Sequence, residues 1–296
     1  NKKGVSNKVL LSELQLLMNG AYRPSHPGAL AHLDPPPLSA SIVGELICAG
    51  LNNNLLAEEL SPTLSSLERK LCKWFCQKLG LGDLSGGVAA SGGSLSNLMA
   101  LVMARNIAGL ESDPNAVFFA SDDCHVSLSK AVRIMGLKRE SLIKIPTDEN
   151  GKLNISCLFS TLKKIKAEGK KCFAVVATAG TTVRGAIDPI YGIAQFCQKE
   201  NIWLHVDGAI GAIYGLSTIT SDLLEGLASA DSITVNPQKL LGISKTSSLL
   251  LVANKSHLSS TFSTGLPYAE PLIGNDSHCG EIGIQGTRSA ESLKLW

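Results

Sequence analysis

The sequence predicts an α/β protein in which a mainly parallel β-sheet carries helices on both faces. Short runs that are nearly continuous in apolar residues recur along the chain, and stretches with helical apolar spacing lie between them. Hydroxyl, charged or glycine residues follow several of these runs directly, at the edge where such sheets bind ligands. The predicted strands are 116–120, 142–145, 173–177, 202–206, 232–235 and 248–252.

Residues 1–82 are expected to form an N-terminal arm and helices that lie over a larger body, residues 83–296. Several prolines interrupt the first 60 residues, so we expect irregular structure there apart from a helix over 39–50. A second helix, over 64–79, is expected to end at Gly80, which suits a C-cap. The helices predicted between the strands are 95–108, 126–135, 155–166, 189–199 and 221–227.

Composition and charge exclude several classes of protein. With 44% hydrophobic residues in a chain of 296, a large core can be buried. The 27 Lys and Arg nearly balance the 25 Asp and Glu, and a net charge of +2 disfavours a nucleic-acid partner held by a broad basic face. No run approaches the roughly 18 apolar residues of a membrane helix, and no signal-peptide pattern follows Asn1. We therefore expect no membrane partner and a cytoplasmic location.

The eight cysteines include no Cys-x-x-Cys pair. This pattern predicts reduced thiols and no metal site. Cys72 and Cys76 lie four residues apart on one face of a predicted helix, where core packing is the expected role.

Charged residues follow two of the predicted strands. Asp207 comes directly after the strand 202–206, and a carboxylate in such an apolar setting needs a cationic partner. Lys239 follows the strand 232–235 at the same edge of the sheet. A plain salt bridge between the two residues is the simplest structural explanation.

Small residues and a glycine-rich turn are expected at this edge too. The segment 178–182 ends in Thr182 and allows a ligand to approach the backbone closely. Residues 91–94, Ser-Gly-Gly-Ser, run straight into a helix and present free N–H groups and a positive dipole end to an anion. No Gly-Lys-Ser/Thr and no Gly-x-Gly-x-x-Gly is present, which disfavours nucleotide binding. A turn that only caps a helix is the alternative.

His125 follows the strand 116–120 and precedes a helix. Its flat ring would suit stacking on an aromatic ligand, although a polar residue at a helix start is an equal alternative. Ser127 and Lys130 match the Ser-x-x-Lys pattern of penicillin-binding serine enzymes, but the companion Ser-Asp-Asn and Lys-Thr-Gly motifs are missing. Together these features favour a ligand with a phosphate, a cationic ring nitrogen, a flat face and an aldehyde, and pyridoxal 5′-phosphate has all four.

These motifs, in this order and at these intervals, resemble those of the group II pyridoxal-phosphate-dependent amino-acid decarboxylases. The resemblance covers nearly the whole chain. It implies the large domain of a fold-type I pyridoxal-phosphate enzyme, similar to the aspartate aminotransferases, that acts as a homodimer with the arm of each subunit wrapped on the other. The matching segments are Ser91-Gly-Gly-Ser94, His125, Gly180-Thr-Thr182, His205-Val-Asp207-x-Ala209 and Asn236-Pro-x-Lys239.

The resemblance also implies the role of each residue. Lys239 would form the internal aldimine, Asp207 would pair with the pyridine nitrogen, and His125 would stack on one face of the ring; these three are the expected catalytic residues. A carboxylate at the ring nitrogen keeps the ring able to accept the electron pair left when carbon dioxide departs. Further cofactor contacts are expected from Gly93, Ser94, Thr182, Ala209, Asn236 and Gln238.

The chain departs from the family pattern at two places. Gln238 stands where the family usually has histidine; it can still donate a hydrogen bond to phosphate but cannot carry a charge. The segment 271–284, where the family has a mobile loop with a tyrosine, contains no tyrosine, and Tyr268 is expected to be a structural residue. Because the chain stops at Trp296, we expect the family's small C-terminal domain to be missing from it.

The expected reaction is the decarboxylation of an L-amino acid. Residues 26–33 and the prolines after them look most like the branch that includes 2,4-diaminobutyrate decarboxylases, and glutamate, cysteine-sulfinate and aromatic substrates stay open. An aminotransferase or desulfurase would use Asp207 and Lys239 in the same way. A catalytically impaired relative is a further alternative, because of Gln238 and the absent tyrosine.

Overall fold

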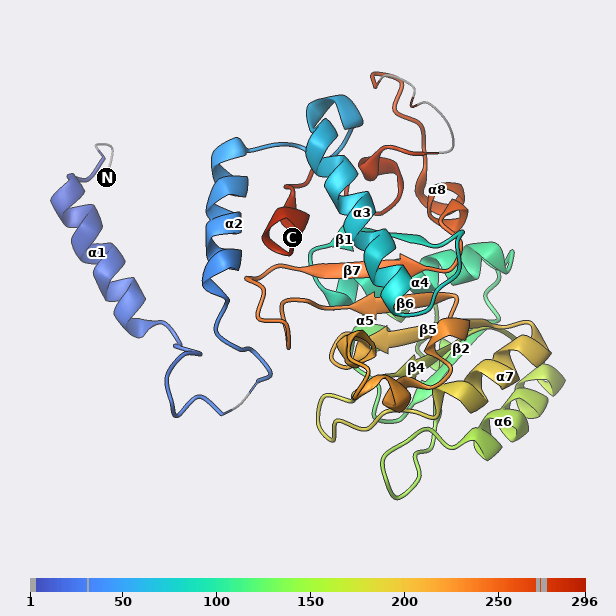
Figure 1. The fold of residues 1–296 in the computed structure, drawn as a ribbon. Helices are drawn as coiled ribbons and strands as arrows, with labels where there is room; N and C mark the ends of the chain where they lie inside the picture. The colour runs from blue at the N-terminus through green and yellow to red at the C-terminus, as the bar shows by residue number, and fades with distance from the viewer. Residues whose placement is uncertain (1–3, 31, 270–271, 273–275) are drawn as a thin grey trace.

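A seven-stranded β-sheet forms the centre of the molecule (Figure 1). The computed structural model describes residues 4–30, 32–269, 272 and 276–296. The strand order is β1-β7-β6-β5-β4-β2-β3. The strands are β1 Gly86–Ala90, β2 Ala116–Ser121, β3 Leu142–Ile145, β4 Lys171–Thr178, β5 Trp203–Gly208, β6 Ser232–Val235 and β7 Ser248–Val252.

All six predicted strands are present, and the mainly parallel sheet is confirmed. β6, β5, β4, β2 and β3 pair in parallel, whereas β7 runs antiparallel between β1 and β6. The sequence does not predict β1, because Gly86-Gly-Val-Ala-Ala lacks the bulky residues typical of strands. A Cβ at Gly87 would lie 2.6 Å from the carbonyl oxygen of Leu250, so this strand pairs with β7 through a close backbone approach.

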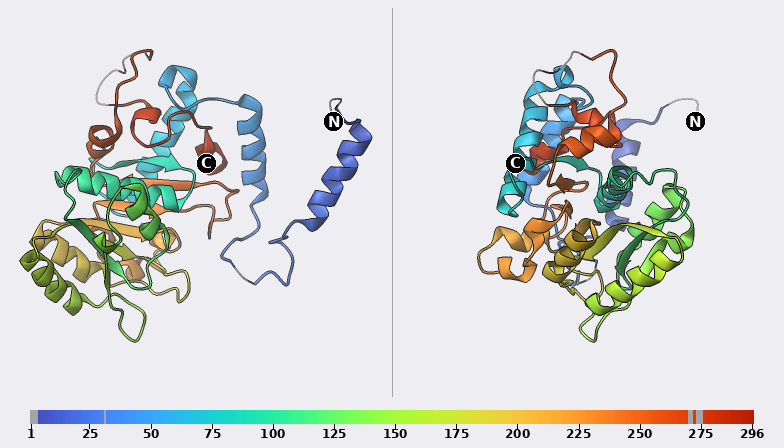
Figure 2. Two further views of the ribbon diagram at one scale, coloured as in Figure 1. Left: turned by 180° about the vertical axis from the view of Figure 1, so that it is seen from behind. Right: turned by 90° about the vertical axis from the view of Figure 1, so that its right-hand side faces the viewer.

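Helices cover both faces of the sheet, as the side view in Figure 2 shows. α4 and α5 pack on one face, and α3, α6 and α7 pack on the other. Cys72 and Cys76 of α3 are buried in the core, as expected. The helices are α1 Asn7–Gly20, α2 Ser39–Leu51, α3 Pro62–Lys78, α4 Gly93–Ile107, α5 Ser127–Ile134, α6 Ile155–Ala167, α7 Ile190–Glu200 and α8 Ser256–Phe262.

Two expectations about helices are wrong. The stretch 221–227 forms short 3₁₀ turns, because Gly226 has a φ of 89°, and a Cβ there would lie 2.5 Å from the Cα of Tyr191. The start of the arm is not irregular: α1 forms because Ser6 caps it and no proline occurs before Pro24.

The N-terminal arm separates into an isolated helix and a docked one. No residue of α1 is buried, and the helix stands away from the rest of the chain (Figures 1 and 2). α2 packs against the last turn of the chain, and a Cβ at Gly44 would lie 2.7 Å from the Cα of Lys294. Within the part of the chain that the structure describes, no helix is long and apolar enough to cross a membrane.

The predicted mobile-loop segment 271–284 lies partly outside the described residues, since 271 and 273–275 are not among them. Tyr268, expected to be structural, is 71% exposed and therefore contributes little to packing.

Candidate active site

A cavity of about 380 Å³ lies at the carboxyl edge of the parallel strands. The strand register brings Thr178 of β4, Asp207 of β5 and Thr234 of β6 side by side at this edge. All nine site residues expected from the sequence line the cavity, although they come from α4, β5 and the loops that follow β2, β4, β5 and β6. They are Gly93, Ser94, His125, Thr182, Asp207, Ala209, Asn236, Gln238 and Lys239.

Asp207 is buried, and neutral groups donate hydrogen bonds to both of its carboxylate oxygens. Its Oδ2 accepts a hydrogen bond from Asn97 Nδ2 at 2.8 Å, and its Oδ1 accepts one from the backbone N–H of Ala209 at 3.2 Å. Among the described residues no ion pair joins Asp207 to Lys239, so the salt-bridge explanation does not hold. A carboxylate that is 5% exposed and held only by neutral donors leaves its charge available to a cation in the cavity.

Asn97, on the second turn of α4, uses all four hydrogen-bonding positions of its amide. Nδ2 donates to Asp207 Oδ2 and, at 3.0 Å, to Ser127 Oγ. Oδ1 accepts from Thr234 Oγ1 at 2.8 Å and from His205 Nε2 at 3.1 Å. Because carboxylate oxygens only accept, the amide can take only this orientation. Asn97 therefore fixes the position of Asp207 and joins α4 to β5 and β6.

His205 is fully buried behind this amide. Burial lowers the pKa of its imidazole to about 4, so the ring is neutral near pH 7. Nε2 carries the proton that Asn97 accepts, and Nδ1 accepts from Ser232 Oγ at 2.9 Å. The hydroxyl of Ser232 in turn accepts from Trp203 Nε1 at 2.9 Å. This chain of partners defines every proton position behind Asp207.

His125 enters the cavity from the loop before α5. The backbone N–H of Ser127 donates to His125 Nδ1 at 3.2 Å, and Ser127 Oγ lies 2.9 Å from the same atom. Nδ1 is thus an acceptor, and the neutral ring carries its proton on Nε2. Burial lowers the pKa of His125; the charge of Asp207 opposes this shift, and those of Lys239 and Lys130 add to it. His125 therefore presents a neutral ring and one N–H donor.

Lys239 lies in the turn after β6 and is half-buried. Burial lowers the pKa of its ammonium group, while the negative charges of Asp207 and Asp34 oppose the shift. A lowered pKa raises the fraction of neutral amine, which is the form that attacks a carbonyl carbon.

The turn between β1 and α4 forms an anion cradle. Gly92 has a φ of 151°, and α4 begins without a side-chain cap. No hydrogen bond is assigned to the N–H groups of Gly93 and Ser94 within the described residues. A Cβ at Gly93 would lie 2.7 Å from Asn236 Nδ2, so only glycine lets this amide reach the helix end. Gly93 and Ser94 line the cavity, so these N–H groups and the positive end of the α4 dipole lie beside it.

Two side-chain amides at the cradle, those of Asn236 and Gln238, accept a hydrogen bond at their oxygen atom. Asn236 Oδ1 accepts from Ser248 Oγ at 2.6 Å, and Gln238 Oε1 accepts from the backbone N–H of Ser247 at 2.7 Å. These bonds orient both amides. Asn236 Nδ2 and Gln238 Nε2 can therefore donate to an anion in the cradle.

Sequence reasoning does not single out Asn97, although the residue holds the centre of the site. It carries no charge and follows no strand. The signal for it in the sequence is weak: an amide beside Ser96 in a helix whose following residues are mostly apolar, and only the structure shows that its side chain is buried.

Comparisons with known proteins agree with this geometry. Residues 6–296 match the family described as the pyridoxal-dependent decarboxylase conserved domain. An aromatic-L-amino-acid decarboxylase of Bacillus atrophaeus is 35% identical over 92% of this chain and 57% of its own length. An L-2,4-diaminobutyrate decarboxylase of Acinetobacter baumannii is 30% identical over 100% of this chain and 62% of its own length. A cysteine sulfinic acid decarboxylase of Rattus norvegicus is 32% identical over 99% of this chain and 62% of its own length.

Solved structures give the same result. The crystal structure of mouse CSAD in apo form superposes with a TM-score of 0.93 at 30% identity, over 99% of this chain and 63% of that one. The chain thus spans about three fifths of the length of the curated relatives it matches.

Proposed function

Since the chain belongs to the pyridoxal-dependent decarboxylase family, we propose that it forms the cofactor-binding part of an enzyme that removes the α-carboxyl group of an L-amino acid. The observation that carries this proposal is the pairing of Asp207 and Lys239 across one cavity without an ion pair between them. The two residues can therefore bind different parts of one ligand. The carboxylate of Asp207 can pair with a cation, and the amine of Lys239 can attack a carbonyl carbon.

The residues of the cavity fit pyridoxal 5′-phosphate. The cradle made by Gly93, Ser94, Asn236 and Gln238 offers N–H donors and a helix end to the phosphate. A Cβ at Gly93 would meet the amide of Asn236, which accounts for glycine there.

Asp207 would hold the proton on the pyridine nitrogen, with its own oxygens kept in place by Asn97 and Ala209. His125 and Ala209 would cover the two ring faces, and Thr182 would lie near the ring substituents.

When bound, pyridoxal 5′-phosphate supplies an electron sink for the electron pair that stays on the α-carbon after carbon dioxide leaves. Lys239 Nζ would hold the aldehyde end, and its half-buried amine can accept a proton and return it. His125 Nε2–H is a donor that can orient an anionic group beside the ring. The network behind Asp207 covers the buried side of that carboxylate and leaves the side that lines the cavity for a ligand.

The relatives named above are decarboxylases, and this supports decarboxylation over amino transfer or desulfuration. Their names cover aromatic, diaminobutyrate and cysteine-sulfinate substrates, so they favour no single side chain. The orientation of Gln238 supports an intact phosphate site over an impaired relative, since its Nε2 group replaces one N–H donor of a histidine.

We further propose that residues 1–82 are an arm through which two copies of the protein associate, and that residues 83–296 are the large domain. The apolar side chains of α1, among them Leu14 and Leu17, are exposed and need a covering surface. A second copy of the chain would supply it. The eight free cysteines favour a reducing, cytoplasmic compartment.

The test uses the full-length protein with added pyridoxal 5′-phosphate. Incubation with 2,4-diaminobutyrate, glutamate, cysteine sulfinate and an aromatic amino acid should release carbon dioxide from one of them. Borohydride reduction and peptide mapping should place the cofactor on Lys239. Lys239→Ala should lose this label, and Lys171→Ala, a change at an exposed lysine, should keep it. A keto acid or sulfide without carbon dioxide would refute decarboxylation, and an unlabelled Lys239 would refute the site.

A further inference from the structure

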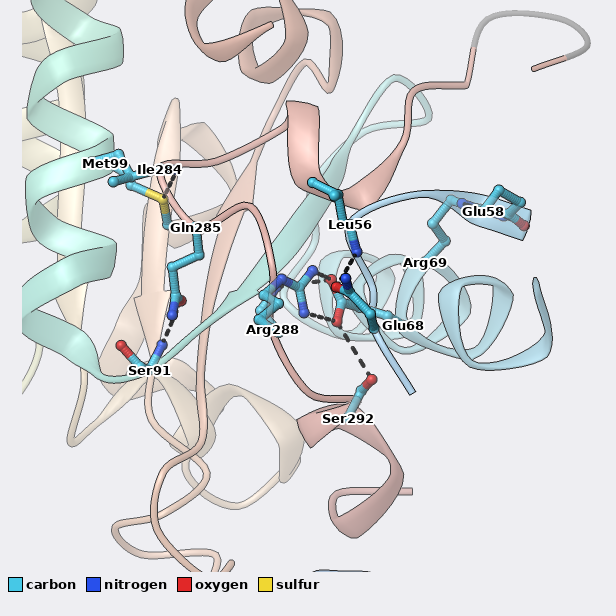
Figure 3. A network of polar contacts seen from close by, with 12 residues as sticks. Leu56, Glu58, Glu68, Arg69, Ser91, Met99, Ile284, Gln285, Arg288 and Ser292 are labelled. Carbon is cyan, nitrogen blue, oxygen red and sulfur yellow. Dashed lines mark hydrogen bonds and ion pairs between the residues drawn. The ribbon is translucent and has the colours of Figure 1, made fainter. Parts of the chain in front are cut away.

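The chain's last segment contacts the anion cradle at Ser91 (Figure 3). The backbone N–H of Ser91, the first residue of the turn, donates to Gln285 Oε1 at 3.2 Å. A backbone N–H can only donate, so the amide of Gln285 presents its oxygen to the turn. Ser91 comes directly after β1 and directly before Gly92, whose φ of 151° turns the chain into α4. Gln285 thus holds the residue at which the cradle begins.

The same segment also packs against the elements on both sides of the turn. A Cβ at Gly283 would lie 3.2 Å from Met99 Sδ of α4 and 3.7 Å from a methyl group of Val88 of β1. The backbone N–H of Ile284 donates to Met99 Sδ at 3.5 Å. Gln285 is therefore positioned by contacts with the strand before the turn and the helix after it.

A buried ion pair anchors the segment three residues further on. Arg288 Nη1 donates to Glu68 Oε2 at 2.7 Å, and Nη2 contacts Oε1, so the pair is bidentate. Oε1 of Glu68 also accepts from the backbone N–H of Ala89 in β1 at 3.2 Å. One carboxylate of α3 thus connects the segment to the strand that leads into the cradle.

We propose that residues 283–288 act as a brace for the cofactor's phosphate cradle, with Gln285 and Arg288 as positioning residues. The proposal rests on the proposed function, since it concerns the phosphate end of the same site. The free N–H groups of the turn bind an anion only if they point to one place, and a loose turn must lose conformational freedom when it binds. The brace restricts the conformation of the turn before the anion binds. It does not touch the ring end of the cavity, where Asp207 and Lys239 lie.

This separation gives a specific test. Full-length protein is titrated with pyridoxal 5′-phosphate and, separately, with pyridoxal, which has the ring and aldehyde but no phosphate; the buffer contains no phosphate. Gln285→Met keeps the length of the side chain and removes the acceptor. We expect its Kd for pyridoxal 5′-phosphate to rise about 3- to 10-fold, the effect of one lost hydrogen bond. The Kd for pyridoxal should change less than about 2-fold.

The matched control is Gln195→Met on α7, where an exposed glutamine amide donates to the hydroxyl of Tyr191 at 3.0 Å. The chemical change is the same, and neither Kd should change. Hydrogen exchange gives a second measurement on cofactor-free protein: the amide of Ser91 should exchange faster in Gln285→Met than in the wild type.

Equal losses for both ligands, or no loss for either, would overturn the brace, as would unchanged exchange at Ser91. A wild-type protein that binds neither ligand would overturn the proposed function, and the exchange measurement would still decide whether Gln285 holds the turn.

Discussion

Replacing Arg288 with methionine should destabilise the protein strongly. The guanidinium group is 7% exposed and its partner Glu68 is 1% exposed, so the charge left behind would have no access to water. The backbone N–H of Ala89 and, at 3.5 Å, the hydroxyl of Ser292 would be its remaining donors. Breaking a buried pair from one side costs about 3–5 kcal/mol, and we expect the free energy of unfolding to fall by that amount.

The chain offers a matched control in the same region. Arg69 and Glu58 also form a bidentate pair, at 2.7 and 2.8 Å, but their side chains are 28% and 21% exposed. Arg69→Met should therefore cost only about 0.2–1 kcal/mol. Urea unfolding at one protein concentration measures both variants, and the slope of the unfolding curve should stay unchanged.

Adding Glu68→Gln to Arg288→Met should restore a large part of the lost stability, because it removes the unpaired charge. Equal costs for Arg288→Met and Arg69→Met, or no recovery in the double variant, would refute the conclusion that burial makes the Arg288 pair costly to break.

Three further predictions concern protonation and assembly. The pKa of His205 is lowered by burial to about 4, below an unfolded value of about 6.5, so its contribution to stability is present above pH 6.5 and lost as the pH falls toward 4. Between pH 7 and pH 5 the wild type should lose about 2 kcal/mol more than His205→Gln in urea unfolding, and equal losses would contradict this. Nitrogen-15 NMR of the full-length protein should show Nδ1 of neutral His125 without a proton, because the N–H of Ser127 donates to it; a proton on Nδ1 would be inconsistent with this geometry. Leu14→Glu with Leu17→Glu should halve the mass found by sedimentation, whereas an unchanged dimer would exclude α1 from the interface.

The strands and the site residues that follow them can be read from the sequence for one physical reason. Strands buried on both faces need near-continuous apolar runs, and polar residues directly after such runs must lie at the carboxyl edge of a parallel sheet. Asp207 and Asn236 satisfy both conditions, Lys239 lies in the turn that follows Asn236, and the structure places all three in one cavity. Helix capping similarly locates the end of α3, where Gly80 has a φ of 81°.

The parts that the sequence does not predict depend on contacts between distant residues. The existence of β1 follows from its pairing with β7, more than 150 residues further along the chain. Nothing local marks Asn97 as the partner of Asp207, because a buried amide is recognised only by the donors and acceptors that surround it.

The hydrophobic pattern and the edge rule therefore predicted the α/β class, the parallel strands and the positions of Asp207 and Lys239 at the carboxyl edge, since both depend on neighbouring residues. The other expected site residues came from the resemblance of the motifs to those of a known family. Only the tertiary structure decided that Asp207 is held by amides instead of by Lys239, that Gln285 reaches the turn at Ser91, and that Arg288 pairs with Glu68. Hydrogen-bond partners and desolvation depend on which distant groups enclose a side chain, and this is established only when the chain is folded.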